Sequence, residues 1–167
     1  MKALLINIII FSLAFNMNTV ENLDIDRFMG KWYVISNIPN FVEKGCKNAY
    51  DIYTLNSDNT VDVLYYAIKD KEEFTIKQNG EIVDKVHNST WKMRFTKPYI
   101  PFYRAPYEVI ILDEEYEYMV IGYPGNTYGW IMSRNNYMDE SLYQNILNTL
   151  KNNFGYNKED FKRVLHD

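Results

Sequence analysis

The side chains that most often perform catalysis are scarce in this chain. Its only cysteine is Cys46, and its two histidines, His87 and His166, lie far from it in sequence. A cysteine nucleophile needs a positioned base, and a zinc site needs three or four ligands, some of them closely spaced. No pair of histidine and cysteine has such spacing. The sequence therefore predicts no catalytic residue, no metal site and no cofactor, and we interpret Cys46 as a spare thiol in a loop.

Aromatic and apolar side chains dominate the composition instead. Hydrophobic residues make up 47% of the 167 residues and aromatic residues 16%, with 15 Tyr and 9 Phe, which favours strands. This length predicts one domain with a sizeable core. The net charge is −4, with 18 basic residues scattered among 22 acidic ones, so no basic stripe is available to bind a nucleic acid.

The first residues resemble an export signal. Lys2 precedes an apolar run, Ala3 to Ala14, that is too short to span a bilayer and suits a signal peptide cut after Ala14. A retained membrane anchor is the alternative. Since no cysteine lies near the end of the run, a lipid-anchored lipoprotein is not expected. We predict a signal peptide at 1–14, an N-terminal arm at 15–24, a folded domain at 25–167 and a secreted or periplasmic location. Peripheral contact with a membrane and the oligomeric state stay open.

Short strands separated by polar turns fill the middle of the chain. The prolines at 98, 101 and 106 make 97–106 a long connection, and Phe41 and Val42 lie in a loop, 38–45, that could fold over a barrel mouth. Helical spacing of apolar residues behind Asp139 predicts one helix over 140–154. A short closing strand is expected within 161–165. The predicted strands are 30–37, 47–55, 61–68, 73–83, 90–95, 107–112, 118–123 and 128–134.

These elements predict an all-β protein, an eight-stranded antiparallel up-and-down β-barrel with one C-terminal α-helix packed on the outside. One sequon, Asn88-Ser89-Thr90, could be glycosylated in a eukaryotic source and predicts an exposed segment.

Three segments resemble, in order, the signature regions of the lipocalin family. They are 26–35 with Gly30-Lys31-Trp32, 112–121, and 128–134 with Arg134 at its end. The whole span 25–165 is similar to the branch of bacterial lipocalins and apolipoprotein D. The resemblance implies an open cup that carries small hydrophobic molecules. It also implies a structural floor of Gly30, Trp32 and Arg134, with the Arg134 guanidinium lying across the Trp32 indole. An Arg134 that holds a ligand headgroup is the alternative.

Strand alternation nominates the wall of the cavity, because every second side chain of a barrel strand points inward. A register error of one residue would invert any one of these sets. We expect Trp130, Trp91 and Tyr107 to lie on the upper wall, and an inward Asp51 would need a polar partner. The predicted ligand-binding residues are Val34, Ser36, Tyr53, Tyr65, Phe74, Gln78, Trp91, Met93, Tyr107, Val109, Met119, Ile121, Tyr128, Trp130 and Met132.

Three functions fit this sequence. The first is non-enzymatic binding and transport of a small hydrophobic or amphipathic ligand, such as a fatty acid, a lysophospholipid or a sterol-like ring, to which tyrosine and tryptophan offer an apolar face and a polar tip. The second is an enzyme in a lipocalin-type cup that acts on a lipid, which needs a reactive group inside. The third is an interaction protein whose barrel is filled by its own side chains.

Overall fold

The computed structural model describes residues 17–167, so the predicted signal peptide at 1–14 lies outside the described residues. The helices are α1 (Ile25–Phe28) and α2 (Glu140–Phe154), with short 3₁₀ helices η1 (Pro124–Asn126) and η2 (Lys158–Asp160). The strands are β1 (Gly30–Asn37), β2 (Lys47–Leu55), β3 (Thr60–Lys69), β4 (Glu72–Ile82), β5 (Thr90–Lys97), β6 (Ala105–Leu112), β7 (Tyr118–Gly122), β8 (Gly129–Ser133) and β9 (Lys162–Arg163).

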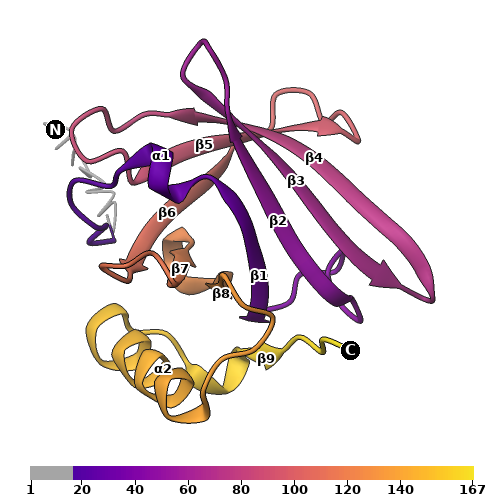
Figure 1. Ribbon diagram of the computed structural model, residues 1–167, viewed down its shortest axis with the longest axis vertical. Helices are drawn as coiled ribbons and strands as arrows, with labels where there is room; N and C mark the ends of the chain where they lie inside the picture. Colours follow the sequence, from indigo (N-terminus) through magenta and orange to yellow (C-terminus); the bar gives the residue numbers. More distant parts are fainter. Residues whose placement is uncertain (1–16) are drawn as a thin grey trace, which may run out of the picture.

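Eight antiparallel strands close into a barrel within residues 17–167. Each strand from β2 to β7 pairs with the strand that follows it, and β1 pairs with both β8 and β2 (Figure 1). The two-residue β9 pairs only with the end of β1, so it extends the sheet and does not close it. The predicted eight-stranded up-and-down barrel is confirmed. No helix in the described part of the chain is long and apolar enough to cross a bilayer.

The helix α2 lies outside the barrel, as expected (Figure 1). Asp139 caps its start by accepting hydrogen bonds from the N–H groups of Ser141 and Leu142, and Gly155 ends it in a left-handed conformation. The helix buries Tyr143, Ile146, Leu147 and Leu150 in a cluster with outward residues of the barrel, namely Ile35, Ile110, Val120 and Ile131. Strands on this side are therefore apolar on both faces.

A β-bulge in β1 contradicts the prediction that Ser36 points into the barrel. Val34 pairs with Met132, but the next pair is Ser36 with Ile131, so the alternation of side chains shifts by one position. The hydroxyl of Ser36 forms a hydrogen bond with the hydroxyl of Tyr143 at 2.9 Å, which places Ser36 against α2. The expectation that Ser36 lines the cavity is wrong, because simple alternation fails across a bulge.

Two segments carry more structure than the sequence predicts. The connection 97–106 is shorter than expected, because Lys97 ends β5 and β6 begins at Ala105, with Pro106 next to its end, where a missing N–H is tolerated. The one-turn α1 was also missed, since four residues carry no periodic pattern. It is capped by Asp24, whose side chain accepts hydrogen bonds from the N–H groups of Asp26 and Arg27.

The described part of the N-terminal arm is packed on the barrel. The N–H of Val20 donates to the carbonyl of Val109 at 2.9 Å, and the side chain of Leu23 is buried in the barrel core. The side-chain amide of Asn88 donates to the carbonyl of Leu23 at 3.3 Å, and Ser89 is fully buried. The expectation of an exposed sequon holds only in part, because Ser89 is buried and the arm half-covers Asn88.

Candidate functional site

The closed end of the barrel holds the predicted structural trio. The backbone of Gly30 has a φ of +96°, a conformation that favours glycine. The guanidinium carbon of Arg134 lies 3.7 Å from the centre of the Trp32 ring, which confirms the predicted cation–π contact. The nitrogens of Arg134 donate to the carbonyls of Lys31 at 2.9 Å and Arg27 at 2.7 Å. These groups serve the fold, and nothing in their geometry favours a headgroup at Arg134.

Aromatic rings fill the closed half above this trio. Phe28 of α1 packs edge-on against Tyr53 and Trp91, with ring centres 5.4 Å apart in both cases. The indole nitrogen of Trp32 donates to the carbonyl of Phe28 at 2.8 Å. Trp91 is fully buried at this end, because β5 begins here, so its expected place on the upper wall beside Trp130 is wrong. α1 therefore acts as a plug that the aromatic floor surrounds.

Most of the predicted wall points inward but is covered by other side chains. These residues share one hydrophobic cluster inside the barrel and expose 6% or less of their surface; they are Val34, Tyr53, Tyr65, Trp91, Met93, Val109, Met119, Ile121 and Met132. Their inward orientation is confirmed, and their contact with a ligand stays a prediction.

The remaining predicted residues are only half-buried. Phe74, Tyr107 and Trp130 pack against the inner cluster without being fully covered. Gln78 pairs with the inward Val63, which places it on the inner face of β4, and the ring of Tyr128 lies 6.2 Å from that of Trp130. Phe74 and Trp130 therefore keep uncovered surface above the packed floor. Tyr107 pairs with Trp91 and stacks on it with ring centres 4.9 Å apart, so its expected place on the upper wall is wrong.

Glu43 is a site residue that the sequence does not reveal. It lies in the loop between β1 and β2, and its two carboxylate oxygens accept hydrogen bonds from the indole nitrogen of Trp130 at 3.0 and 3.2 Å. Asn40 donates to the same carboxylate at 2.6 Å. The loop does fold over the mouth, but with this acid turned inward. Phe41 of the same loop does not cover the mouth, because its side chain is 89% exposed.

Asp51 is the second acid on the inside. It pairs with Trp32 in β1 and with Tyr65 in β3, both of which face inward. The partner that a buried Asp51 needs is the hydroxyl of Tyr53, which donates to its Oδ2 at 3.2 Å. The hydroxyl of Tyr107 donates in turn to that of Tyr53 at 2.8 Å. An acid and two tyrosines thus form a hydrogen-bonded chain across the interior.

Burial shifts the protonation of both acids. Loss of solvation raises the pKa of Glu43 to about 7, against the opposing hydrogen bonds from Trp130, Asn37 and Asn40. Loss of solvation, and then the charge of Glu43, raise the pKa of Asp51 to about 8, while the bond from Tyr53 lowers it. Asp51 retains some uncovered surface although protein surrounds it, because that surface faces the barrel interior.

The described residues show no constellation for metal binding or nucleophilic catalysis. Within 17–167 no group of three His, Cys, Asp or Glu side chains could hold a metal ion. Burial raises the pKa of the Cys46 thiol, which keeps it protonated and weakly nucleophilic. His166 is hydrogen-bonded to the backbone carbonyl of Val34, and His87 to the backbone of Asn22, so neither is placed as a base for Cys46.

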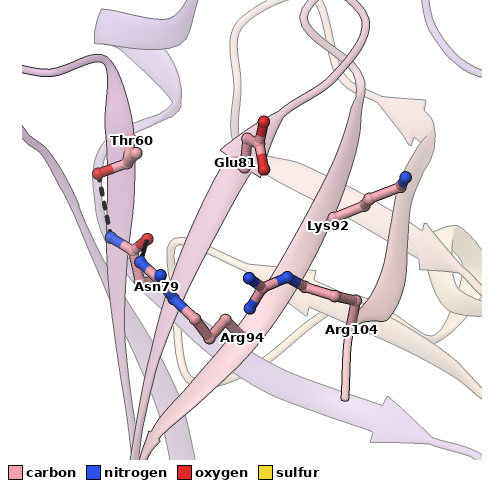
Figure 2. A pocket seen from close by; sticks show the side chains of 6 residues that line it. All are labelled: Thr60, Asn79, Glu81, Lys92, Arg94 and Arg104. Carbon is pink, nitrogen blue, oxygen red and sulfur yellow. Dashed lines mark hydrogen bonds between the residues drawn. The ribbon is translucent and has the colours of Figure 1, made fainter. Parts of the chain in front are cut away.

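A shallow groove on the outer face of β3, β4 and β5 is separate from the barrel interior. Figure 2 shows the groove, of about 210 Å³, with Arg94 bonded to the side-chain oxygen of Asn79 at 2.8 Å. Lys92 and Arg94 face solvent here, as the alternation along β5 predicts. A polar lining with charges of both signs does not suit an apolar ligand. The groove is lined by Thr60, Asn79, Glu81, Lys92, Arg94 and Arg104.

Comparison with known proteins places these features in one family. Residues 23–166 match the family described as the lipocalin-like domain. Temperature-induced lipocalin-1 of Arabidopsis thaliana is 31% identical over 136 residues, which cover 78% of this chain and 73% of that protein. The outer membrane lipoprotein Blc of Citrobacter freundii is 28% identical over 131 residues, which cover 78% and 73%.

The fold comparison agrees with the sequence comparison. The structure of insecticyanin from the tobacco hornworm Manduca sexta superposes with a TM-score of 0.69 at 16% identity, covering 91% of this chain and 85% of that chain. The closed eight-stranded barrel, the outer helix and the match over 23–166 lead to one conclusion. This chain belongs to the lipocalin family, whose members bind small hydrophobic ligands.

Proposed function

We propose that this protein binds and transports a small hydrophobic or amphipathic ligand inside its barrel, without chemical conversion. The observation that carries the proposal is the contrast between the two halves of the interior. Phe28, Trp32 and Trp91 fill the closed half without exposed surface, whereas Phe74 and Trp130, which lie toward the mouth, are only half-buried. A pocket with aromatic walls and a few polar groups suits a ligand of this kind.

The polar groups inside favour an amphipathic ligand over a pure hydrocarbon. The hydroxyl of Tyr107, the amide of Gln78 and the carboxyl of Asp51 lie on the inner face, while Phe74 offers an apolar surface. A fatty acid, a lysophospholipid and a sterol-like ring are the three classes with such mixed character. The apolar part would lie on the aromatic wall, and the polar head would meet these side chains.

An enzyme in the cup is the weaker alternative. It would need a reactive group inside, and the thiol nearest the interior, Cys46, has a raised pKa that disfavours the thiolate. A barrel filled by its own side chains is the other alternative, and the half-buried Phe74, Tyr107 and Trp130 argue against it. Neither alternative has an observation in its favour.

Export is a separate part of the proposal. It rests on the basic and then apolar character of residues 1–14, which suits a secretory signal. Expression of the full chain in a secretory host, followed by N-terminal sequencing of the protein recovered from the medium or periplasm, tests it. A mature chain that begins at residue 15 is the expected result, and retention of Met1 in the cytosol would contradict it.

The ligand can be tested directly. The protein, purified from its native source, is extracted with organic solvent and its lipids are identified by mass spectrometry. A bound lipid should also change the fluorescence of Trp130, because Trp32 and Trp91 are fully buried in the floor. Trp130→Phe should therefore abolish most of the ligand-dependent signal while leaving the emission of the other two tryptophans.

A matched pair of variants separates binding from folding. Trp130→Ala should weaken ligand binding about tenfold or more, which corresponds to roughly 1.4 kcal/mol or more. Tyr137→Ala removes an aromatic side chain that is 73% exposed outside the barrel and should leave the affinity unchanged. The carrier proposal fails if no lipid co-purifies and no fatty acid, lysophospholipid or sterol alters the fluorescence.

A further inference from the structure

The interior of the barrel holds two carboxyl groups, and neither forms a salt bridge with a basic side chain of the described residues. Glu43 enters from the loop above β2, and Asp51 points inward from β2 itself. Within residues 17–167 the salt bridges join Arg27 to Glu115 and Arg163 to Glu140, so neither inner carboxyl pairs with a basic side chain. The hydrogen bond from Tyr53 occupies Oδ2 of Asp51, and no described residue donates to Oδ1. Asp51 therefore keeps one oxygen open to the interior, which is an acceptor when the carboxyl is ionised.

The titratable groups around Glu43 and Asp51 are either neutral or already hydrogen-bonded to the backbone. Burial, above all, raises the pKa of each neighbouring tyrosine, so the hydroxyls stay protonated at neutral pH. The ammonium of Lys69 donates to the carbonyl of Val42 at 2.6 Å, lies 5.8 Å from the centre of the Phe74 ring, and forms no salt bridge with either carboxylate among the described residues. The titratable groups that face the pair, from β2, β3, β6 and the loop, are Tyr53, Tyr65, Tyr107, Cys46 and Lys69.

Aromatic faces complete the surroundings of the acids. Tyr65 and Phe74 meet edge to face with ring centres 6.2 Å apart, and Trp130 lies over the mouth with its nitrogen bonded to Glu43. Aromatic faces attract cations, most strongly where water is excluded. Two carboxyl groups that form no salt bridge, beside such rings, stabilise an organic cation and disfavour an anion as they ionise.

We propose that the barrel selects a ligand that carries an ammonium group on an apolar body. The ammonium binds beside Asp51 and Glu43, donates to the open oxygen of Asp51 if it carries hydrogens, and lies against the aromatic wall. The apolar body occupies the rest of the inner surface. This inference rests on the proposed function and narrows it, because a fatty acid anion would bring a further negative charge beside two carboxyl groups, a cost that grows as they ionise.

Four probes with the same twelve-carbon chain test the charge preference. Dodecylammonium, dodecyltrimethylammonium, dodecanol and dodecanoate are titrated into the protein at pH 8, below the micelle concentrations of the ionic probes and the solubility limit of dodecanol. Affinity is measured by calorimetry. Both cations should bind about tenfold tighter than dodecanol, and dodecanoate should bind more weakly than dodecanol. Tighter binding of dodecylammonium would indicate a ligand whose amine donates a hydrogen bond. Tighter binding of dodecyltrimethylammonium would indicate a ligand with a choline-type headgroup.

The pH dependence supplies a second readout. Affinity for dodecyltrimethylammonium, whose charge does not titrate, should rise between pH 6 and pH 9 as Glu43 and Asp51 ionise, because their pKa values are about 7 and 8. Asp51→Asn should remove most of this rise and most of the preference over dodecanol, while dodecanol itself binds as before. Glu72→Gln, which neutralises an exposed acid at the start of β4, is the control and should change neither.

The outcomes distinguish this inference from the function on which it rests. Equal affinity for dodecanol and the two cations at pH 8, or a cation preference that survives in Asp51→Asn, overturns the charge selectivity and leaves lipid binding intact. If none of the four probes binds, dodecanol included, the ammonium selectivity fails, whereas the proposed function fails only if the extraction and the fluorescence titrations also find no lipid. Thermal unfolding of each variant verifies that it is folded.

Discussion

The tryptophans of this protein have different roles, and the surroundings of each side chain indicate its role. Trp32 is sealed between Phe28 and the guanidinium of Arg134, with its nitrogen bonded inside the floor. Trp130 keeps uncovered surface and binds a loop carboxylate. The same residue type therefore supports the fold at one end of the barrel and faces the mouth at the other.

This division predicts unequal costs for the same truncation. Trp32→Ala should lower the free energy of unfolding by about 3–5 kcal/mol, because it opens a cavity in a fully buried core and leaves Arg134 without its ring. Trp130→Ala should cost clearly less, since its side chain is only half-buried. Urea denaturation followed by circular dichroism measures both. Equal losses of stability would show that floor and wall are not distinct.

The glycine before Trp32 predicts a second stability effect. Gly30→Ala places a Cβ at φ +96° and 3.4 Å from Nη1 of Arg134, so backbone strain and crowding add, at a cost of about 1–2 kcal/mol or more. Gly45→Ala is the matched control, because its φ is +82° with nothing within 4 Å of the new Cβ. Urea midpoints should shift further for Gly30→Ala, and an equal shift would mean that Arg134 tolerates the methyl group.

At the scale of elements, alternation along the strands predicted the inner face well where strands are regular. Trp91 and Met93 face inward and Lys92 faces out, because hydrophobic burial fixes the register of β5. The prediction for Ser36 was wrong because a β-bulge leaves no sign in the alternation of apolar and polar residues. Glu43 could not be found from sequence, since a loop has no period and its acid points inward only through contacts with Asn40 and Trp130.

Mutation of Asp139 tests how much the N-terminal cap of α2 stabilises the protein. Asp139→Ala removes the acceptor for two N–H groups at the start of α2 and should destabilise the protein by about 0.5–2 kcal/mol. Asp139→Asn keeps an equivalent acceptor and should lie within a few tenths of a kcal/mol of the natural protein. Thermal unfolding by calorimetry compares the two. A large loss in Asp139→Asn would point to the charge and its helix dipole as the main contribution.

At the scale of the whole molecule, the inner acids make stability depend on pH. The folded-state pKa values of about 7 for Glu43 and about 8 for Asp51 lie above those of the unfolded chain, so the folded state binds more protons. Their contribution is fully present below the unfolded pKa, near 4, and is lost as pH rises through 7 and 8. The melting temperature without ligand should therefore fall between pH 5 and pH 9.

Neutral replacements of Glu43 and Asp51 test whether these two acids cause the fall of the melting temperature with pH. Asp51→Asn and Glu43→Gln should each flatten the decline of the melting temperature, and the double variant should flatten it further. Glu72→Gln, in an exposed position, should leave the slope as it is. A slope that persists in the double variant would assign the pH dependence to other groups and remove the support for two protonated acids inside the barrel.

The placement of β1 has a consequence for the time course of folding. Its first half pairs with β2, but its second half pairs with β8, about a hundred residues later in the chain. During synthesis the edge of β1 must wait, unpaired, until residues 129–133 leave the ribosome. Contacts between such distant segments slow folding, and an exposed edge invites association with other chains. Closure of this seam is therefore expected to be the late step at which a nascent chain is most exposed to chaperones and aggregation.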